Sequence, residues 1–111
     1  MRLGFAPLFG VLAACVLAAC ASPDRAFWGS EEQRVTIDGR DYAVFVRRDA
    51  GAPRARVQVI RLGYARRPEH VAILVAMRQA AEQASGCTVI EGSAEGDSGV
   101  MSARLECAAP A

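Results

Sequence analysis

Hydrophobic and polar residues alternate in two stretches that follow residue 33. Residues 35–37 and 42–46 follow this alternation, which is typical of strands with one buried face. Asp38-Gly39 between them is the favoured two-residue turn of an antiparallel hairpin. Residues 57–62 are rich in β-branched side chains and predict a third strand, after a loop at 49–53.

The hydrophobic spacing becomes helical between Pro68 and Gly86. Pro68 suits a first helical position and Gly86 suits the residue just past a helix end. Side chains recurring at three- and four-residue intervals mark one face of this helix. They are His70, Ile73, Leu74, Met77, Ala80, Ala81 and Ala84. The alanines at the C-terminal end of the face predict that this end lies close to a sheet.

Two further strands are expected at 87–91 and 100–107, on either side of a polar loop. Placing Cys87 opposite Cys107 sets Val89 across from Leu105 on the more apolar side, which supports this register and a disulfide. The prediction is therefore an α+β domain of order β-β-β-α-β-β. It has a mostly antiparallel sheet of about five strands with one helix packed on one face. A bridge closing about 20 residues contributes about 3 kcal/mol.

The first twenty residues follow a different pattern, in which Arg2 is the one charged residue. A positive start, an apolar run and small residues at its end are the parts of a secretory signal. Leu17-Ala18-Ala19-Cys20 resembles the lipobox of bacterial lipoproteins, in which the cysteine becomes the first mature residue and carries fatty acyl chains such as palmitate. The resemblance covers this segment alone. It implies a signal peptide at 1–19 and acylation of Cys20. Residues 20–33 then form a lipidated tether, and the predicted strands and helix form a single domain at 34–108.

Leu12-Ala13-Ala14-Cys15 repeats the letters of the lipobox five residues earlier. Cleavage there would leave an apolar stub, because the chain turns polar only at residues 22–25, and would leave Cys20 as an odd thiol. Cleavage before Cys20 instead leaves the two later cysteines as a pair, and we favour it. An uncleaved transmembrane anchor is the alternative. A span needs about 17–25 apolar residues, and this run reaches only the lower limit, with Pro7 inside it.

The resemblance also implies a location. In this class of protein, a neutral residue after the acylated cysteine directs a Gram-negative lipoprotein to the outer membrane, and Ala21 is such a residue. We therefore expect the periplasmic face of the outer membrane, with membrane lipid as a partner through Cys20. The periplasm is oxidising and permits a disulfide. An exported, tethered domain is not expected to bind nucleic acid.

Charge is balanced over the chain, with 13 basic and 12 acidic residues, but it is unevenly distributed. Every basic residue is Arg; most arginines lie between residues 47 and 67, and acids gather between 82 and 106. The candidate binding patch consists of Arg47, Arg48, Arg54, Arg56, Arg66 and Arg67. One interpretation is that these groups are solvated faces that pair with each other in the fold. The other is a basic surface for an anionic glycolipid, lipid headgroups or an acidic envelope protein.

Candidate catalytic chemistry is sparse. Gly96-Asp97-Ser98-Gly99 resembles the stretch around the nucleophile of chymotrypsin-like serine proteases, but those enzymes use a His and an Asp on a far larger double barrel. We therefore predict a turn here. His70 lies outside that family's histidine motif, and we expect it to be partly buried and hydrogen-bonded to a backbone group or an acid. One histidine and no CxxC give no metal site, and we expect neither metal nor cofactor.

Three hypotheses on function follow. The first is a non-enzymatic binding or envelope-assembly module tethered through Cys20. The second is an inhibitor of an envelope-attacking hydrolase such as lysozyme or a protease, in which the loop at 91–99 presents Glu95 and Asp97 to a cationic cleft. The third is a minor enzyme centred on His70, for which the sequence reveals no catalytic partner.

Overall fold

The computed structural model describes residues 22–48 and 52–107. The expected signal peptide, Cys20 and most of the expected loop at 49–53 lie outside the described residues. Within the described ranges, no helix is long and apolar enough to cross a membrane.

The predicted hairpin is confirmed. It consists of β1 (Glu32–Ile37) and β2 (Arg40–Arg48), and its closing pair is Ile37 with Arg40. The turn residues Asp38 and Gly39 both have positive φ, at 51° and 77°. Positive φ at both central residues is the turn geometry whose twist matches that of the flanking strands.

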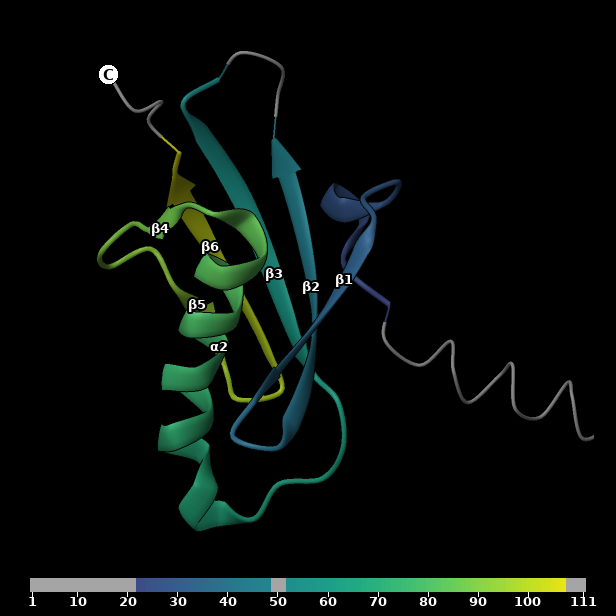
Figure 1. Cartoon of the computed structure of the whole chain (residues 1–111), viewed down its shortest axis with the longest axis vertical. Coiled ribbons are helices and arrows are strands. Elements are labelled where there is room, and N and C mark those ends of the chain that lie inside the picture. Colours follow the sequence, from purple (N-terminus) through teal and green to yellow (C-terminus); the bar gives the residue numbers. More distant parts are fainter. Residues whose placement is uncertain (1–21, 49–51, 108–111) are drawn as a thin grey trace, which may run out of the picture.

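The remaining strands extend one antiparallel sheet. β3 (Arg54–Arg61) pairs with β2, and β6 (Val100–Glu106) pairs with β3, so the order is β1-β2-β3-β6-β4. The expected strand at 87–91 is reduced to β4 (Thr88–Val89), because a turn begins at Ile90. The expected polar loop contains one more short strand, β5 (Glu95–Gly96), which also pairs with β6. The fold class is α+β, as predicted (Figure 1).

A single-turn 3-10 helix, η3 (Arg67–Glu69), leads into α2 (His70–Ser85), which packs on one face of the sheet (Figure 1). Gly86 ends the helix with φ 71° and donates its N–H to the carbonyl of Glu82. The buried residues of α2 are Ile73, Ala76, Met77, Ala80 and Ala81. Ala76 was not predicted to be buried, and Leu74 is 41% exposed. The buried face of α2 is thus rotated slightly about the helix axis from the predicted face.

Two apolar clusters lie on opposite faces of the sheet. The larger one fills the space between α2 and the sheet, and includes Tyr42, Val57 and Leu105. The smaller one consists of Phe27, Ala43 and Phe45 on the other face. Phe27 belongs to the 3-10 helix η2 (Arg25–Phe27), so the segment predicted as a tether packs on the domain through this residue.

Trp28 differs from Phe27. Its side chain is 65% exposed. Its indole N–H donates to the carbonyl of Pro23 at 3.2 Å, and the guanidinium of Arg25 lies 5.6 Å from the ring centroid. The two neighbouring aromatic residues therefore have opposite environments, one buried against the sheet and one at the surface.

The predicted disulfide is confirmed, with the Cα atoms of Cys87 and Cys107 4.7 Å apart. Val89 pairs with Leu105, which is the predicted register. Because β4 is only two residues long, the bridge is the strongest connection between this edge of the sheet and β6.

Candidate functional site

Three arginines lie side by side on the sheet face opposite α2. Arg47 of β2 pairs directly with Arg56 of β3, and Arg56 pairs directly with Arg104 of β6. The neighbouring row, Val46, Val57 and Ala103, packs toward α2. Because successive side chains of a strand point to opposite faces, the three arginines point to the open face. We call Arg47, Arg56 and Arg104 the arginine row.

The arginine row concentrates positive charge at the surface. Directly opposed residues on antiparallel strands have Cβ atoms about 4.5–5.5 Å apart, and like charges in such positions are destabilising. All three side chains are exposed. Among residues 22–48 and 52–107, no carboxylate lies within salt-bridge distance of any of them. Nearby Arg54, in contrast, lies 3.5 Å from the carboxylate of Glu106.

The surface around the row is hollowed on two sides. One hollow, of about 340 Å³, is lined by Arg47, Arg54, Arg56 and Arg104 together with two alanines. A second, of about 250 Å³, is bordered by Phe27, Ser102 and again Arg56 and Arg104. Guanidinium groups that border an open hollow can donate paired hydrogen bonds to a phosphate or carboxylate.

The segment that leads from the N-terminus is fixed beside the row. Gln58, only 1% exposed, donates from Nε2 to Asp24 Oδ2 at 2.9 Å and to Ser102 Oγ at 3.0 Å. Its Oε1 accepts the backbone N–H of Asp24 at 2.8 Å. Arg47 Nη1 donates to the carbonyl of Ala26 at 2.9 Å. Gln58 is also the next residue after Arg56 on the open face of β3.

The structure divides the six arginines of the predicted patch. Arg47, Arg54 and Arg56 share the open face. Arg48 projects to the other face, where Nη2 donates to the disulfide sulfur of Cys87 at 2.6 Å. Arg66 and Arg67 lie at η3, and Arg66 Nε is 3.1 Å from Glu69 Oε1. The basic stretch therefore does not form one surface.

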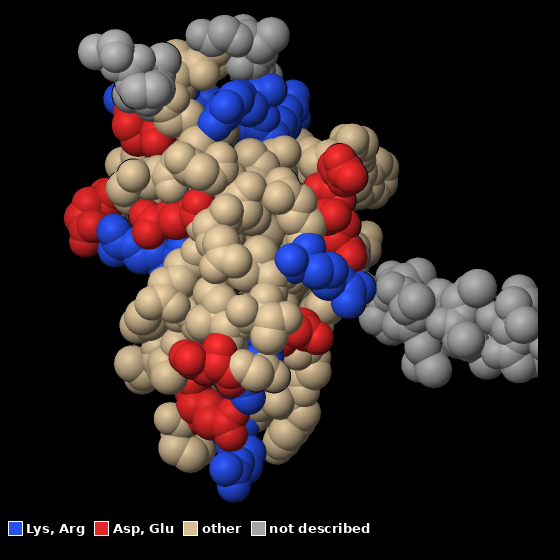
Figure 2. All heavy atoms as spheres, viewed as in Figure 1, with Lys and Arg blue, Asp and Glu red and all other residues tan. Residues whose placement is uncertain are grey.

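Arg104 completes the row, and sequence reasoning missed it. It lies in a stretch of the chain dominated by acids. The pairing of β3 with β6 brings it beside Arg56, and that pairing joins segments far apart in the chain. The face that bears α2 has a different character. In Figure 2, small groups of basic and acidic residues are separated there by uncharged surface.

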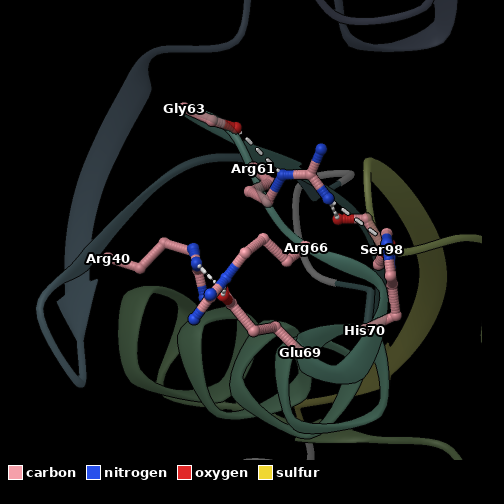
Figure 3. Close-up of polar contacts among 7 residues, drawn as sticks. All are labelled: Arg40, Arg61, Gly63, Arg66, Glu69, His70 and Ser98. Carbon is pink, nitrogen blue, oxygen red and sulfur yellow. Dashed lines mark hydrogen bonds and ion pairs between the residues drawn. The ribbon is translucent and has the colours of Figure 1, made fainter.

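A second polar cluster involves His70 (Figure 3). Its Nδ1 is hydrogen-bonded to the hydroxyl of Ser98, which is 6% exposed. Arg61 Nη1 donates to the carbonyl oxygen of Ser98 at 2.9 Å and to its Oγ at 3.4 Å. The partner of His70 is thus a hydroxyl, rather than the backbone group or acid expected from the sequence.

A serine–histidine pair acts as a nucleophile when the hydroxyl is accessible and a third group orients the imidazole. Ser98 is buried, and no acid of the described chain is hydrogen-bonded to His70. The carboxylate of Asp97 instead accepts the N–H groups of Gly99 and Val100 at 2.7 and 3.0 Å. These hydrogen bonds lower the pKa of Asp97 below its ordinary value. The hydrogen bonds of Ser98 with Arg61 and His70 connect the loop at 91–99 to β3 and α2.

Glu69 makes a similar connection at the start of α2 (Figure 3). Its carboxylate accepts hydrogen bonds from Arg40 Nη2 and from Arg66 Nε. The two guanidinium groups lower the pKa of Glu69, and Glu69 raises the pKa of Arg40. The cluster links the beginning of β2 with the N-terminal end of the helix.

The described part of the chain has no group of three or more His, Cys, Asp or Glu side chains placed to hold a metal ion. No protein-family model, no curated protein and no solved structure matches the chain.

Proposed function

We propose that the protein is a non-enzymatic binding module of the bacterial cell envelope, anchored by lipid on Cys20, which binds an anionic partner through the arginine row. The observation that carries this proposal is the direct cross-strand pairing of Arg47, Arg56 and Arg104. Such a row is costly to the free protein. A phosphate or carboxylate bound between the guanidinium groups replaces repulsion with charge-assisted hydrogen bonds.

Two features support the envelope as the compartment. The segment Leu17-Ala18-Ala19-Cys20 resembles a lipobox, and the Cys87–Cys107 disulfide is typical of an oxidising compartment. By the sorting pattern of this class, Ala21 favours the periplasmic face of the outer membrane.

The anchor is tested by the intact mass of protein extracted from membranes. Cleavage before Cys20 and acylation of that cysteine give a mass equal to residues 20–111 plus the acyl groups, less the two hydrogens of the disulfide. A mature chain that begins at Met1 or at Cys15 would contradict the proposal.

The partner is tested by crosslinking in intact cells. The wild-type protein should capture an anionic lipid or an anionic envelope protein, and the R47Q/R56Q/R104Q variant should lose it. The double variant R66Q/R67Q is the matched control, because it also removes arginine charge but at η3, away from the row. Capture of the same component by the row variant and the wild type would refute anion binding by the row.

One observation favours the alternative, a hydrolase inhibitor. The loop at 91–99 is held by Asp97 and by the Ser98–His70 contact, and it presents Glu95 at the surface. A pre-organised loop binds a cleft at a lower entropic cost. Substitution of Glu95 tests the inhibitor hypothesis better than substitution of Asp97 or Ser98, because those two side chains maintain the conformation of the loop. E95Q should relieve any inhibition of lysozyme or a protease and leave the fold intact.

A further inference from the structure

We propose that the anionic partner of the arginine row is the phosphate-bearing surface of the membrane that anchors the protein. The domain then lies on that membrane with its open sheet face toward the lipid headgroups. This inference rests on the proposed function, that is, on acylation of Cys20 and on anion binding by Arg47, Arg56 and Arg104.

The length of chain between the anchor and the fold carries the first part of the argument. Asp24 follows Cys20 by four residues, and four residues span at most about 14 Å when fully extended. Asp24 is fixed to Gln58 by two hydrogen bonds. Gln58 lies two residues from Arg56 on the same face of β3, a separation of about 7 Å. With the length of the Gln58 side chain and its hydrogen bond added, the row is within roughly 30 Å of the acylated residue.

Such a short connection restricts the orientation of the domain. The chain reaches the fold on the open face, where Phe27 packs with Ala43 and Phe45. Because Asp24 follows Cys20 by only four residues, the surface around this point is the one held nearest to the lipid. The face that bears α2 is directed away from the membrane, and there Val71 and Val75 remain exposed.

The positive charge of this surface also favours an anionic membrane as the partner. The row adds three positive charges that have no carboxylate of the described residues within salt-bridge distance, whereas nearby Arg54 is paired with Glu106. Electrostatic attraction between a basic side chain and an anionic membrane acts within about one Debye length, about 8 Å at physiological salt. Each arginine near such a surface strengthens binding roughly fivefold. The short connection lets the row come within that range of the membrane that holds Cys20.

Trp28 provides a third observation. It is 65% exposed and belongs to the same segment that borders the row. Tryptophan is enriched at membrane–water interfaces, where its ring lies at the level of the headgroups. Trp28 is the one tryptophan of the chain, so its fluorescence reports on this surface.

The test uses the full acylated protein reconstituted in two kinds of vesicle. One contains zwitterionic phosphatidylcholine alone, and the other also contains anionic phosphatidylglycerol; both carry brominated acyl chains that quench tryptophan. We expect stronger quenching of Trp28 in the anionic vesicles. The difference should disappear at about 1 M NaCl, where the Debye length is about 3 Å.

The row variant R47Q/R56Q/R104Q should remain anchored but lose the difference between the two vesicles. Its ratio of docked to undocked protein should fall roughly a hundredfold, because three arginines are removed. R66Q/R67Q, which removes arginines at η3, should behave as the wild type. Co-flotation with the vesicles measures anchoring independently of docking.

The outcomes separate this inference from the proposed function. Equal quenching of the wild type in both vesicles, with co-flotation intact, would overturn membrane docking and leave the anchor standing. Absence of acyl chains in the intact mass would overturn the anchor itself. Inorganic polyphosphate that binds the row while anionic vesicles do not would identify a soluble anion as the partner, and that also overturns docking.

Discussion

At the scale of single residues, Arg56 occupies an unusual position. It lies between Arg47 and Arg104 on the two neighbouring strands, where opposite charges are favourable and like charges are not. Arg54, two residues away on the same strand, has Glu106 as its pairing partner and lies in an ion pair with it. The arginine row therefore does not stabilise the sheet through cross-strand ion pairs, as Arg54 and Glu106 can.

R56Q should therefore make the domain more stable and weaken its binding to anions. Relief of two like-charge contacts is expected to raise the free energy of unfolding by about 0.2–1 kcal/mol. Urea unfolding measures the stability, and retention on heparin measures the affinity. R54Q is the control and should change stability little, because exposed ion pairs contribute little. A clear loss of stability in R56Q would contradict this explanation of the row.

The pKa values of Asp97 and Glu69 predict how the stability of the fold depends on pH. Their pKa values in the folded protein are below the ordinary values of 3.8 and 4.5. Each carboxylate thus binds a proton more readily in the unfolded chain, and its contribution is fully present above the unfolded value. It is lost as the pH falls through the folded value. We expect the melting temperature to fall below about pH 4.5.

This prediction is tested by measuring the melting temperatures of D97N and E95Q between pH 7 and pH 3. D97N should flatten the acid limb of the profile, because it removes one of the two carboxylates. E95Q is the control for the loss of one negative charge, because it removes an exposed carboxylate of the same loop. An acid limb that is the same in D97N and the wild type would show that the contacts of Asp97 with Gly99 and Val100 do not stabilise the fold.

At the scale of elements, contacts with α2 and β3 hold the loop between β5 and β6 in place. Ser98 contacts His70 on the helix and Arg61 on β3. S98A should lower the free energy of unfolding by about 1–3 kcal/mol, because buried partners lose a hydrogen bond. H70A should have a similar effect, and the double variant should cost less than the sum. Additive effects in this double-mutant cycle would show that the contact is energetically unimportant.

The edge formed by β4 depends on the disulfide. β4 contributes only two paired residues, and Cys87–Cys107 closes a segment with a sequence separation of 20. C87S/C107S should lower the free energy of unfolding by about 3 kcal/mol, mainly through the greater freedom of the unfolded chain. Urea unfolding of the wild type with and without a reductant should give the same difference. A stability unaffected by the reductant would contradict this role.

At the scale of the whole molecule, the two faces of the domain differ in charge and in their relation to the N-terminal segment. The open face carries the arginine row and receives the N-terminal segment. The face that bears α2 carries small groups of both signs (Figure 2). If Cys20 is the anchor, the short connection makes docking effectively intramolecular, and its strength depends on linker length.

Insertion of a flexible Gly/Ser segment between Ser22 and Pro23 tests this dependence. About 20 inserted residues give a mean end-to-end distance of about 25 Å, so the local concentration of headgroups around the row should fall. Quenching of Trp28 in anionic vesicles is expected to decrease while co-flotation stays unchanged. Quenching that is insensitive to the insertion would show that docking does not depend on the short connection.

The sequence by itself determined the features that arise from neighbouring residues. The turn at Asp38-Gly39 and the helix end at Gly86 follow from backbone conformations that these residues favour. The register of Cys87 with Cys107 follows from a simple alternation across one loop. The lipobox resemblance is also local, and the anchor it implies remains a prediction.

Only the tertiary structure decided which distant residues meet. Arg104 reaches Arg56 through the pairing of β3 with β6, and Ser98 reaches His70 through the packing of a loop on α2. Periodicity shows which face of an element is apolar, but not which strand lies beside it or how far a helix is rotated. Those outcomes depend on the packing of the whole core. For this reason the basic stretch was visible in the sequence, whereas the arginine row was not.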